Sequence, residues 1–272
     1  MSDFRLKVFQ SVAKNLSFTK ASQELFVSQP AITKHIQELE ATYQTRLFDR
    51  QGSKISLTES GRLLLEHCER ILEEYKRLEY EMHLLHNEYI GELKLGASTT
   101  IAQYVLPPLL GSFIGKFPQV NLSLLNGNSR EIEAALQEHR IDLGLVEGVF
   151  RLPNLKYTTF LEDELVAVVH SKSRLQLPEE ITPQDLPAIP LVLRERGSGT
   201  LDVIERSLQK HGVKLSSLHV LMYLGSTESI KLFLENSDCM GIVSIRSICK
   251  ELAAGTFRVV EIKDMPMLRD FC

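Results

Sequence analysis

The chain of 272 residues has no tryptophan, only four cysteines and no long uninterrupted hydrophobic run. The cysteines show neither C-x-x-C pairing nor the spacing of metal ligands, so we expect reduced thiols and no metal site. A disulfide between Cys239 and Cys249 finds no support in pattern or charge. No apolar segment could cross a bilayer, and no basic region followed by an apolar run opens the chain. The sequence therefore predicts a cytoplasmic protein without a membrane partner.

Catalytic motifs are missing as well. The serines form no G-x-S-x-G elbow, and the eight histidines form no HExxH or similar cluster. We therefore predict no catalytic residue, no cofactor and no enzymatic activity. With 43% hydrophobic and 24% charged residues, a chain of this length is long enough to form two or three domains.

The net charge of −4 is unevenly distributed along the chain. Residues 1–58 hold eight Lys or Arg and five Asp or Glu, whereas residues 59–90 hold four and eight. The N-terminal segment alone is basic, as contact with DNA phosphates requires. This asymmetry is weak by itself and gains weight from the motif that lies in the same segment.

Residues 16–36 read as two short amphipathic helices joined by a tight turn, the pattern of a helix-turn-helix. Ser28 is a good N-cap for the second helix, and Pro30 in its first turn loses no hydrogen bond. The apolar face is predicted to consist of Ile32, Ile36, Leu39 and Tyr43, and the opposite face of Pro30, Thr33, Lys34 and Gln37. A helix that reads the major groove needs one apolar face buried against a core and an opposite polar and basic face exposed to DNA, which is the pattern found here.

Residues 47–57 contain two short apolar runs around a turn with Gly52 and predict a hairpin, or wing, beside the helix-turn-helix. Basic residues at its tip suggest contact with the DNA backbone or minor groove, although an ordinary solvated hairpin would have the same pattern. Gln29 and Thr33 are expected at base edges and Lys34 at a base or phosphate. The predicted DNA-binding residues are Ser17, Thr19, Ser28, Gln29, Pro30, Thr33, Lys34, Gln37, Arg50, Ser53 and Lys54.

Residues 59–90 show apolar positions at alternating steps of three and four, which predicts one long helix with a heptad seam. Thr58 is the expected N-cap, and Gly91 ends the pattern. A narrow seam needs a partner helix, so we predict dimerisation; the alternative is one long helix packed on the chain's own C-terminal domain. The predicted seam residues are Leu64, Cys68, Ile71, Tyr75, Leu78, Met82 and Leu85.

From residue 91 the pattern changes to alternating strands and helices, which predicts two α/β lobes with parallel-type sheets and a cleft between them. Strands are expected at 92–97, 119–125, 141–146, 164–170, 190–194, 218–224, 239–245 and 257–262. Helices are expected at 100–115, 129–139, 199–211, 227–236 and 246–254.

Several helices of this part begin with hydroxyl or amide side chains directly after a strand. Such residues together with free backbone N–H groups favour a carboxylate, sulfate or phosphate, although simple helix capping is the better explanation for any single one of them. For the set as a whole, a site for a small anionic metabolite between the lobes is favoured only by the resemblance of the chain to a known family. The predicted effector-binding residues are Ser98, Thr99, Thr100, Asn128, Ser129, Arg194, Ser198, Gly199, Thr200, Ser226 and Thr227.

The N-terminal segment resembles the LysR-type transcriptional regulators. The matching residues are Phe9, Val12, Ser17-Phe18-Thr19, Ala21, Leu25, Ser28-Gln29-Pro30-Ala31, Ile36, Leu39-Glu40, Leu47-Phe48, Arg50, Leu57-Thr58 and Gly61. Tyr43-Gln44 departs from the Leu-Gly usual in the family, which puts the turn toward the wing in doubt, and family members usually extend beyond Cys272. The run at 194–200 is similar to a segment in regulators of carbon fixation and sulfur assimilation.

The resemblance implies an α+β multi-domain protein: a winged helix-turn-helix at 1–58, a coiled-coil linker helix at 59–90 and an effector-binding domain at 91–272. That domain would have the type II periplasmic-binding-protein fold, with crossings near 161–163 and 264–267. Lobe I would hold residues 91–161 and 267–272, and lobe II residues 162–266.

We therefore interpret the sequence as a transcriptional regulator that responds to a metabolite. Its predicted partners are an operator in double-stranded DNA, further copies of the chain as a homodimer or homotetramer, a small effector and RNA polymerase. The alternative from another class is a solute-binding protein without a transcriptional role. Residues 16–36 and the missing signal peptide argue against it.

Overall fold

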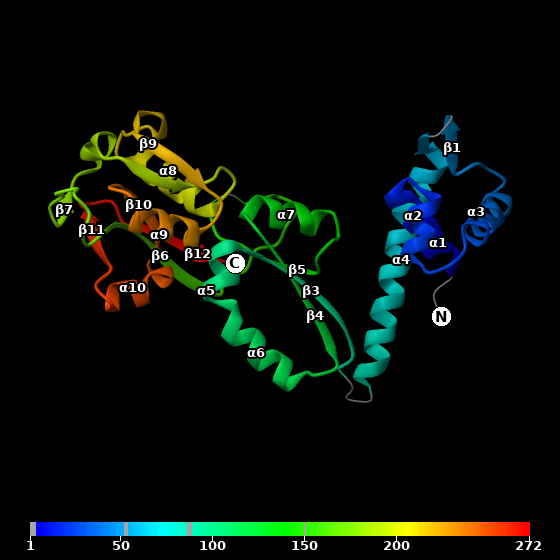
Figure 1. Cartoon of the computed structure of the whole chain (residues 1–272). Coiled ribbons are helices and arrows are strands. Elements are labelled where there is room, and N and C mark those ends of the chain that lie inside the picture. The colour runs from blue at the N-terminus through cyan, green and yellow to red at the C-terminus, as the bar shows by residue number, and fades with distance from the viewer. Residues whose placement is uncertain (1–3, 52–53, 86–88, 150) are drawn as a thin grey trace. The chain divides into compact units, whose positions relative to one another are not determined.

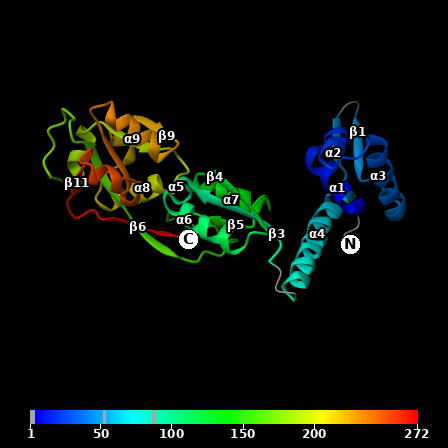
Figure 2. The same ribbon diagram turned by 60° about the horizontal axis from the view of Figure 1, so that its bottom comes forward.

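The computed structural model describes residues 4–51, 54–85, 89–149 and 151–272. Two compact units make up the chain, Met1–Ile90 and Gly91–Cys272 (Figures 1 and 2). Within the described residues, every helix is too short or too polar to traverse a membrane.

The first unit contains helices α1 (Phe4–Asn15), α2 (Phe18–Glu24), α3 (Gln29–Tyr43) and α4 (Glu59–Leu84), with the antiparallel hairpin β1 (Phe48–Gln51) and β2 (Lys54–Leu57). The predicted helix-turn-helix and wing are therefore present. One core joins these elements, and the Phe48 ring in it packs against Phe9 and Phe18.

The predicted caps and the apolar face of α3 explain why this unit folds as it does. The hydroxyls of Ser28 and Thr58 accept hydrogen bonds from the first turns of α3 and α4. On α3, Ile32, Ile36 and Leu39 are buried as predicted. Tyr43, the last residue of α3, is 53% exposed, so its assignment to the apolar face was wrong.

Gln44 ends α3 in the left-handed conformation, with φ of 50°, and its N–H is bonded to the carbonyl of Ala41. The N–H of Thr45 reaches back to the carbonyl of Glu40 at 3.1 Å. This is the arrangement that usually requires glycine at the left-handed position. The turn toward the wing is thus formed although Gln44 replaces the usual glycine.

Helix α4 is shorter than predicted, and its first half packs on the core of the first unit. Cys68 is fully buried, its Sγ donates to the carbonyl of Leu6 at 3.3 Å, and burial raises the pKa of the thiol to about 12. Leu64 also packs against this core. Assigning Cys68 to a seam between two chains was therefore wrong, whereas Leu64 is only half-buried and its place in the seam stays a prediction.

The remaining seam positions carry exposed apolar side chains. Ile71 is 42% exposed, Leu78 53%, Met82 52% and Leu85 76%, and Tyr75 is half-buried. Because the described helix ends at Leu84, Leu85 is its C-cap and the predicted continuation to residue 89 is not helical where it is described.

The second unit begins with a parallel sheet of order β4-β3-β5, formed by β3 (Gly91–Ser98), β4 (Val120–Gly127) and β5 (Leu143–Leu145). Helix α7 (Ser129–Gln137) packs on it. The helix predicted at 100–115 is divided into α5 (Thr99–Tyr104) and α6 (Leu106–Lys116). The break precedes Pro107 and Pro108, which have no N–H to continue the hydrogen bonds of a helix.

The second sheet has the order β7-β11-β6-β10-β8-β9, with β12 also paired to β6. Its strands are β6 (Leu161–His170), β7 (Glu180–Ile181), β8 (Leu191–Arg194), β9 (Val220–Leu224), β10 (Met240–Ser244), β11 (Phe257–Ile262) and β12 (Met267–Phe271). Helices α8 (Gly199–Lys210), α9 (Thr227–Glu235) and α10 (Cys249–Ala253) and the short 3-10 helices η1 (Pro183–Ala188), η2 (Leu215–Ser217) and η3 (Ile245–Ser247) complete this lobe. Strand β6 is antiparallel to β10, β11 and β12, so a purely parallel sheet was wrong here.

Strands β6 and β12 run side by side and connect the two lobes (Figures 1 and 2). Leu161 and Phe271 belong to the core of the first lobe, whereas Leu165 and Met267 belong to that of the second. The N–H and carbonyl of Cys272 then pair with the backbone of Val146 at the end of β5.

Candidate functional site

The predicted reading face of α3 is open to solvent. Ser28, Gln29, Pro30, Lys34 and Gln37 are exposed and lie opposite the buried face. Thr33 is half-buried, and its hydroxyl donates to the carbonyl of Gln29 at 3.1 Å. Its methyl group and oxygen lone pairs remain available to a base.

The remaining predicted DNA contacts have mixed outcomes. Ser17 is the N-cap of α2 and accepts from the N–H of Lys20 at 3.2 Å, and Thr19 is exposed in the first turn. Ser53 lies outside the described residues. Arg50 and Lys54 lie in β1 and β2, but their side chains are also outside the described part of the structure.

Phe26, in the turn between α2 and α3, was missed by the sequence reasoning. It is 95% exposed and has φ of 54°, a conformation rare for a bulky residue. Its place two residues before Ser28 was the available signal, because an apolar residue there lies outside the helical period of either helix.

In the second unit, three hydroxyls predicted to bind an effector converge on a buried ion pair. Ser98 and Thr100 both donate to the carboxylate of Glu147, Thr100 at 3.2 Å. Nη1 of Arg269 lies 3.5 Å from Oε1 of Glu147 and donates to the Thr200 hydroxyl at 2.8 Å. The side chains of Glu147 and Arg269 are 1% and 0% exposed. These hydroxyls are therefore occupied within the protein.

Arg269 also binds the second lobe. Its Nε donates to Oδ2 of Asp163 at 2.8 Å, and its Nη2 lies 2.7 Å from the same oxygen. Oδ1 of Asp163 accepts from the Ser244 hydroxyl at 2.7 Å and lies 3.5 Å from Nε of Arg246. Charged residues in strands β6 and β12 thus form a continuous buried network with Glu147, which sequence reasoning missed.

The other predicted residues near helix starts serve mostly as structural contacts. Ser129 donates to the carbonyl of Glu147 at 2.7 Å, and Ser198 caps α8 by accepting from the N–H of Leu201 at 3.2 Å. Thr227 is buried in the first turn of α9. Gly199 is also buried, and its surroundings leave no space for a side chain.

Arg194 is 1% exposed and is held by its neighbour Glu195, through Nε to Oε2 at 2.8 Å and Nη2 to Oε1 at 3.0 Å. The same Nη2 donates to the Thr99 hydroxyl and to the carbonyl of Gly225, each at 3.4 Å. Among the described residues, none accepts a hydrogen bond from its buried Nη1.

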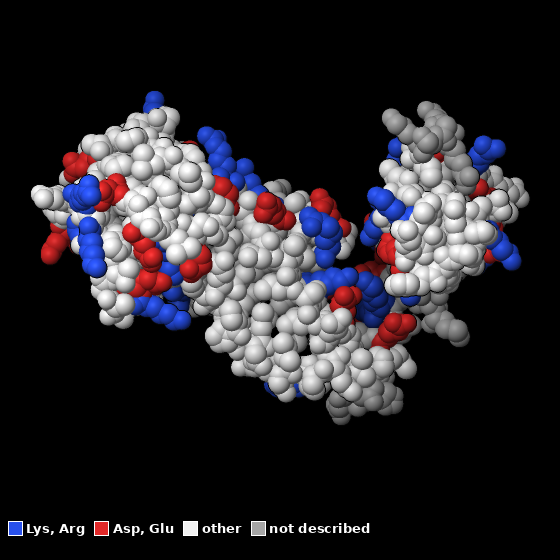
Figure 3. Space-filling view, viewed as in Figure 1, with Lys and Arg blue, Asp and Glu red and all other residues white. Residues whose placement is uncertain are grey.

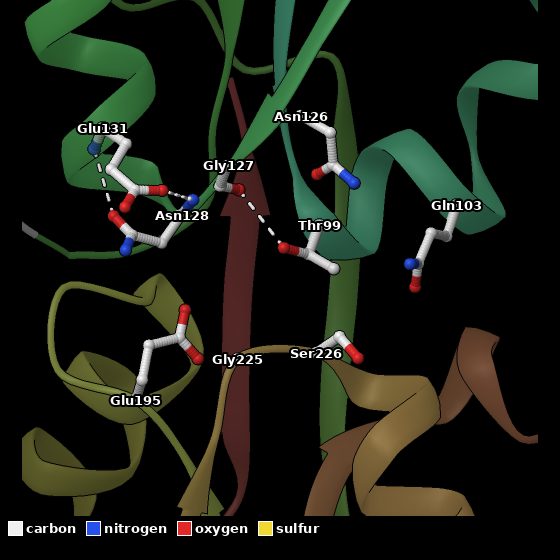
Figure 4. A pocket seen from close by; sticks show the side chains of 9 residues that line it. All are labelled: Thr99, Gln103, Asn126, Gly127, Asn128, Glu131, Glu195, Gly225 and Ser226. Carbon is white, nitrogen blue, oxygen red and sulfur yellow. Dashed lines mark hydrogen bonds between the residues drawn. The ribbon is translucent and has the colours of Figure 1, made fainter.

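An open cavity of about 280 Å³ lies between the lobes beside Arg194. Its lining includes three predicted residues, Thr99, Asn128 and Ser226. The other lining residues are Gln103, Asn126, Gly127, Glu131, Glu195 and Gly225. Figure 4 shows the amide of Asn126 and the carboxylate of Glu195 directed into this space.

Both carboxylates of this cavity already have partners. Glu131 forms a capping box with Asn128, and Glu195 holds Arg194. A second cavity, of about 310 Å³, is lined by residues of α7, by Glu147 and Gly148 and by Asp202. The two cavities flank a contact between the lobes, in which the N–H of Arg130 donates to the carbonyl of Gly197 at 3.3 Å.

A further contact joins α5 to α9, because the hydroxyl of Tyr104 donates to Glu228. Nζ of Lys231 lies 2.8 Å from Glu228 and 2.5 Å from Glu251. Burial raises the pKa of Tyr104 well above its usual value. Burial acts to raise the pKa of Glu228, but the hydrogen bonds from Lys231 and Tyr104 outweigh it and leave that pKa below its usual value.

The two units also match two protein families. Residues 4–62 match the bacterial regulatory helix-turn-helix protein, lysR family, and residues 86–272 match the LysR substrate binding domain. The chain belongs to the LysR family of transcriptional regulators. It is thus a DNA-binding regulator with an effector-binding domain, as the resemblance implied.

Similar LysR-type proteins cover almost the whole chain. The HTH-type transcriptional regulator CysL of Bacillus subtilis is 30% identical over 97% of this chain and 87% of its own length. A probable RuBisCO transcriptional regulator of Cyanidioschyzon merolae is 32% identical, over 97% of this chain and 88% of its own. These relatives confirm the similarity to the subgroups of carbon fixation and sulfur assimilation.

Solved structures of LysR-type regulators share the fold. CbnR complexed with its target DNA covers 100% of this chain and 92% of its own, with a TM-score of 0.63 and 24% identity. The regulatory domain of Synechocystis CcmR, in complex with 2-PG, covers 66% of this chain and 85% of its own, with a TM-score of 0.59 and 29% identity.

Proposed function

We propose that this LysR-type regulator reads an operator through the exposed face of α3 and alters its binding when a small metabolite occupies the cavity beside Thr99. The observation that carries the first part is the geometry of α3. Ile32, Ile36 and Leu39 fix the helix on its core, and Gln29, Thr33 and Lys34 are thereby held on the opposite side. A rigidly mounted polar face fits the major groove.

We test the reading face with a matched pair of threonines. Thr33 and Thr42 both donate their hydroxyl to the carbonyl four residues earlier, and at about 100° per residue they lie on opposite sides of α3. Thr33→Ala should weaken operator binding by about 1–3 kcal/mol and relax specificity at one position, whereas Thr42→Ala should leave binding unchanged. The DNA is the region upstream of its own gene, and affinity is measured by fluorescence anisotropy against random DNA.

The same measurement in increasing salt separates base from phosphate contacts. Lys34→Ala should weaken binding to all sequences and lower the salt slope by about one unit, if Lys34 contacts a phosphate. If Thr33→Ala and Thr42→Ala had the same affinity for the operator and the same affinity for random DNA, another surface would read the operator.

We infer that the effector is a small polar metabolite with a carboxylate or phosphate group. Helix α9 begins at the cavity, where the N–H groups of its first turn favour an anion, whereas N–H groups at the start of α7 are bonded to Asn128 and Gly197. The complex of the 29% identical CcmR domain with 2-PG supports this class of ligand. Thr100 is no longer expected to contact it, because its hydroxyl is bonded to Glu147.

Asn126 offers a clean test, because its side chain faces the cavity and it can be removed without breaking a hydrogen bond that the structure shows (Figure 4). Operator binding is titrated with 2-PG for wild type, Asn126→Ala and the control Asn121→Ala, at the exposed other end of β4. We expect Asn126→Ala to need about tenfold more 2-PG than the other two. Identical responses of the three proteins would place the ligand elsewhere, and no response at all would exclude 2-PG as the effector.

We further propose a homodimer or homotetramer that acts on RNA polymerase, with no catalytic step and no cofactor besides the effector. The exposed apolar side chains of Ile71, Leu78 and Met82 support one contact between chains. Leu109 and Ile114 of α6 are 56% and 52% exposed, and the face over α6 in Figure 3 carries little charge, which supports a second contact.

A further inference from the structure

The carboxylate of Glu147 occupies the position that a bound acid would be expected to take between the lobes. Glu147 follows β5 in the first lobe. Its carboxylate accepts hydrogen bonds from the hydroxyls of Ser98 and Thr100 at the start of α5. Ser98 makes no capping bond to α5, because its hydroxyl is turned to Glu147 instead. The donors that sequence reasoning assigned to an external anion are therefore used by a residue of the chain itself.

Arg269 of β12 forms an ion pair with the same carboxylate. Its Nη1 lies 3.5 Å from Glu147 and 2.8 Å from Thr200 at the start of α8, while Asp163 binds its remaining nitrogens. All three charged side chains are at most 1% exposed. Buried polar groups need partners, so removing Glu147 would leave Arg269 with Asp163 alone and the two hydroxyls of α5 without their acceptor.

We propose that Glu147 is a built-in carboxylate ligand, which joins the two lobes where an external acid would otherwise bridge them. The lobes of this chain are thus held together without a small molecule at Ser98, Thr100 and Arg269. A free acid cannot bind there while Glu147 is in place, because a second carboxylate would face a like charge. Glu147 therefore also closes this position to an effector and leaves the cavity beside Thr99 open to one.

The test is replacement of the side chain by a free acid. In Glu147→Ala the missing atoms are a methylene and a carboxylate, and acetate has the same two carbons. The full chain carrying Glu147→Ala should melt lower than wild type by on the order of 10 °C. Sodium acetate, compared with sodium chloride of equal concentration, should then raise its melting temperature by clearly more than it raises that of wild type.

The matched control is Glu131→Ala, which removes a carboxylate of the same length from the other cavity between the lobes. The effect of acetate relative to chloride on its melting temperature should match that in wild type. Equal responses of Glu147→Ala to the two salts, or the same acetate effect in Glu131→Ala, would overturn the proposal.

Glu147→Gln keeps the test decisive if the alanine variant does not fold. The amide fills the site, but its single oxygen can accept from only one of the two hydroxyls, which bind different oxygens of Glu147, and it carries no negative charge to face Arg269. We expect faster hydrogen exchange than in wild type at 97–101, 199–203 and 267–271, and no response to acetate. Unchanged exchange there would show that the carboxylate does not hold the lobes.

The proposal depends on the ion pair and not on the effector proposed above. Rescue by acetate together with an absent 2-PG response would support Glu147 and contradict 2-PG as the ligand. A normal 2-PG response without rescue by acetate would support 2-PG as the ligand and contradict the role of Glu147.

Discussion

Gly199, the first residue of α8, lies directly against the backbone carbonyl of Glu147. A Cβ at position 199 would come within 2.0 Å of that oxygen and 2.4 Å of its carbon. Both neighbours are backbone atoms, which cannot rotate away as a side chain would. The close approach of the two lobes at this point thus requires glycine.

Gly199→Ala is therefore expected to force the lobes apart or to strain them. We predict a loss of about 1–3 kcal/mol in the free energy of unfolding. Chemical denaturation of the full chain measures it, and Gly225→Ala is the control, because a Cβ there meets nothing within 4 Å. Equal stability of the two variants would mean that the lobes do not come this close in solution.

Leu78 and Leu63 test the surface of α4 at which two chains are expected to meet. They are 53% and 60% exposed, but only Leu78 lies in the heptad seam. Leu78→Glu should raise the dimer dissociation constant by about tenfold or more, because it removes apolar contact and places a charge in it. Leu63→Glu should not. Sedimentation at several protein concentrations gives both constants, and an equal effect of the two changes would contradict the seam.

Most elements were predictable from the sequence because they depend on local patterns. Ser28 and Thr58 cap helices where expected, and Ile32, Ile36 and Leu39 form the predicted buried face. The heptad pattern predicted Cys68 in a seam between chains, but Cys68 lies in the core of its own unit. Spacing shows that a helix face is apolar, but not which partner covers it.

The interlobe site was predicted only in part, because it depends on residues far apart in the sequence. Hydroxyl residues at helix starts were found by position, but Ser98 and Thr100 serve Glu147, which lies 49 and 47 residues away. Arg269 meets Thr200 across 69 residues. Local periodicity carries no information about such pairs, although a charged residue directly after an apolar strand, as at 147, was an available sign.

Gln44→Gly is predicted to stabilise the first unit. Gln44 has φ of 50°, where a side chain is strained and glycine is not. We expect a gain of about 0.5–1 kcal/mol in the free energy of unfolding, since the relief of strain exceeds the greater freedom of glycine in the unfolded chain. The control Gln37→Gly, inside the same right-handed helix, should lose about the same amount. A loss of stability in both variants would contradict the strain at Gln44.

The contact between Tyr104 and Glu228 should depend on pH. The pKa of Glu228 is lowered in the folded state, since the hydrogen bonds from Lys231 and Tyr104 outweigh the effect of burial. A carboxyl with a lowered pKa stabilises the fold above its unfolded value, near 4.5, and this stabilisation is lost as the pH falls through the folded value.

Glu228→Gln should therefore melt below wild type by about 1–4 °C at neutral pH, and the difference should shrink as the pH falls below about 4.5. Glu235→Gln, at the exposed end of the same helix, is the control and should match wild type throughout. Tyr104→Phe removes the hydroxyl that joins α5 to α9, so a double-mutant cycle with Glu228→Gln isolates the contact between the lobes from the ion pair with Lys231. Additive effects of the two changes would show that Glu228 is bound only within its own lobe, and a difference that does not vary with pH would contradict the lowered pKa of Glu228.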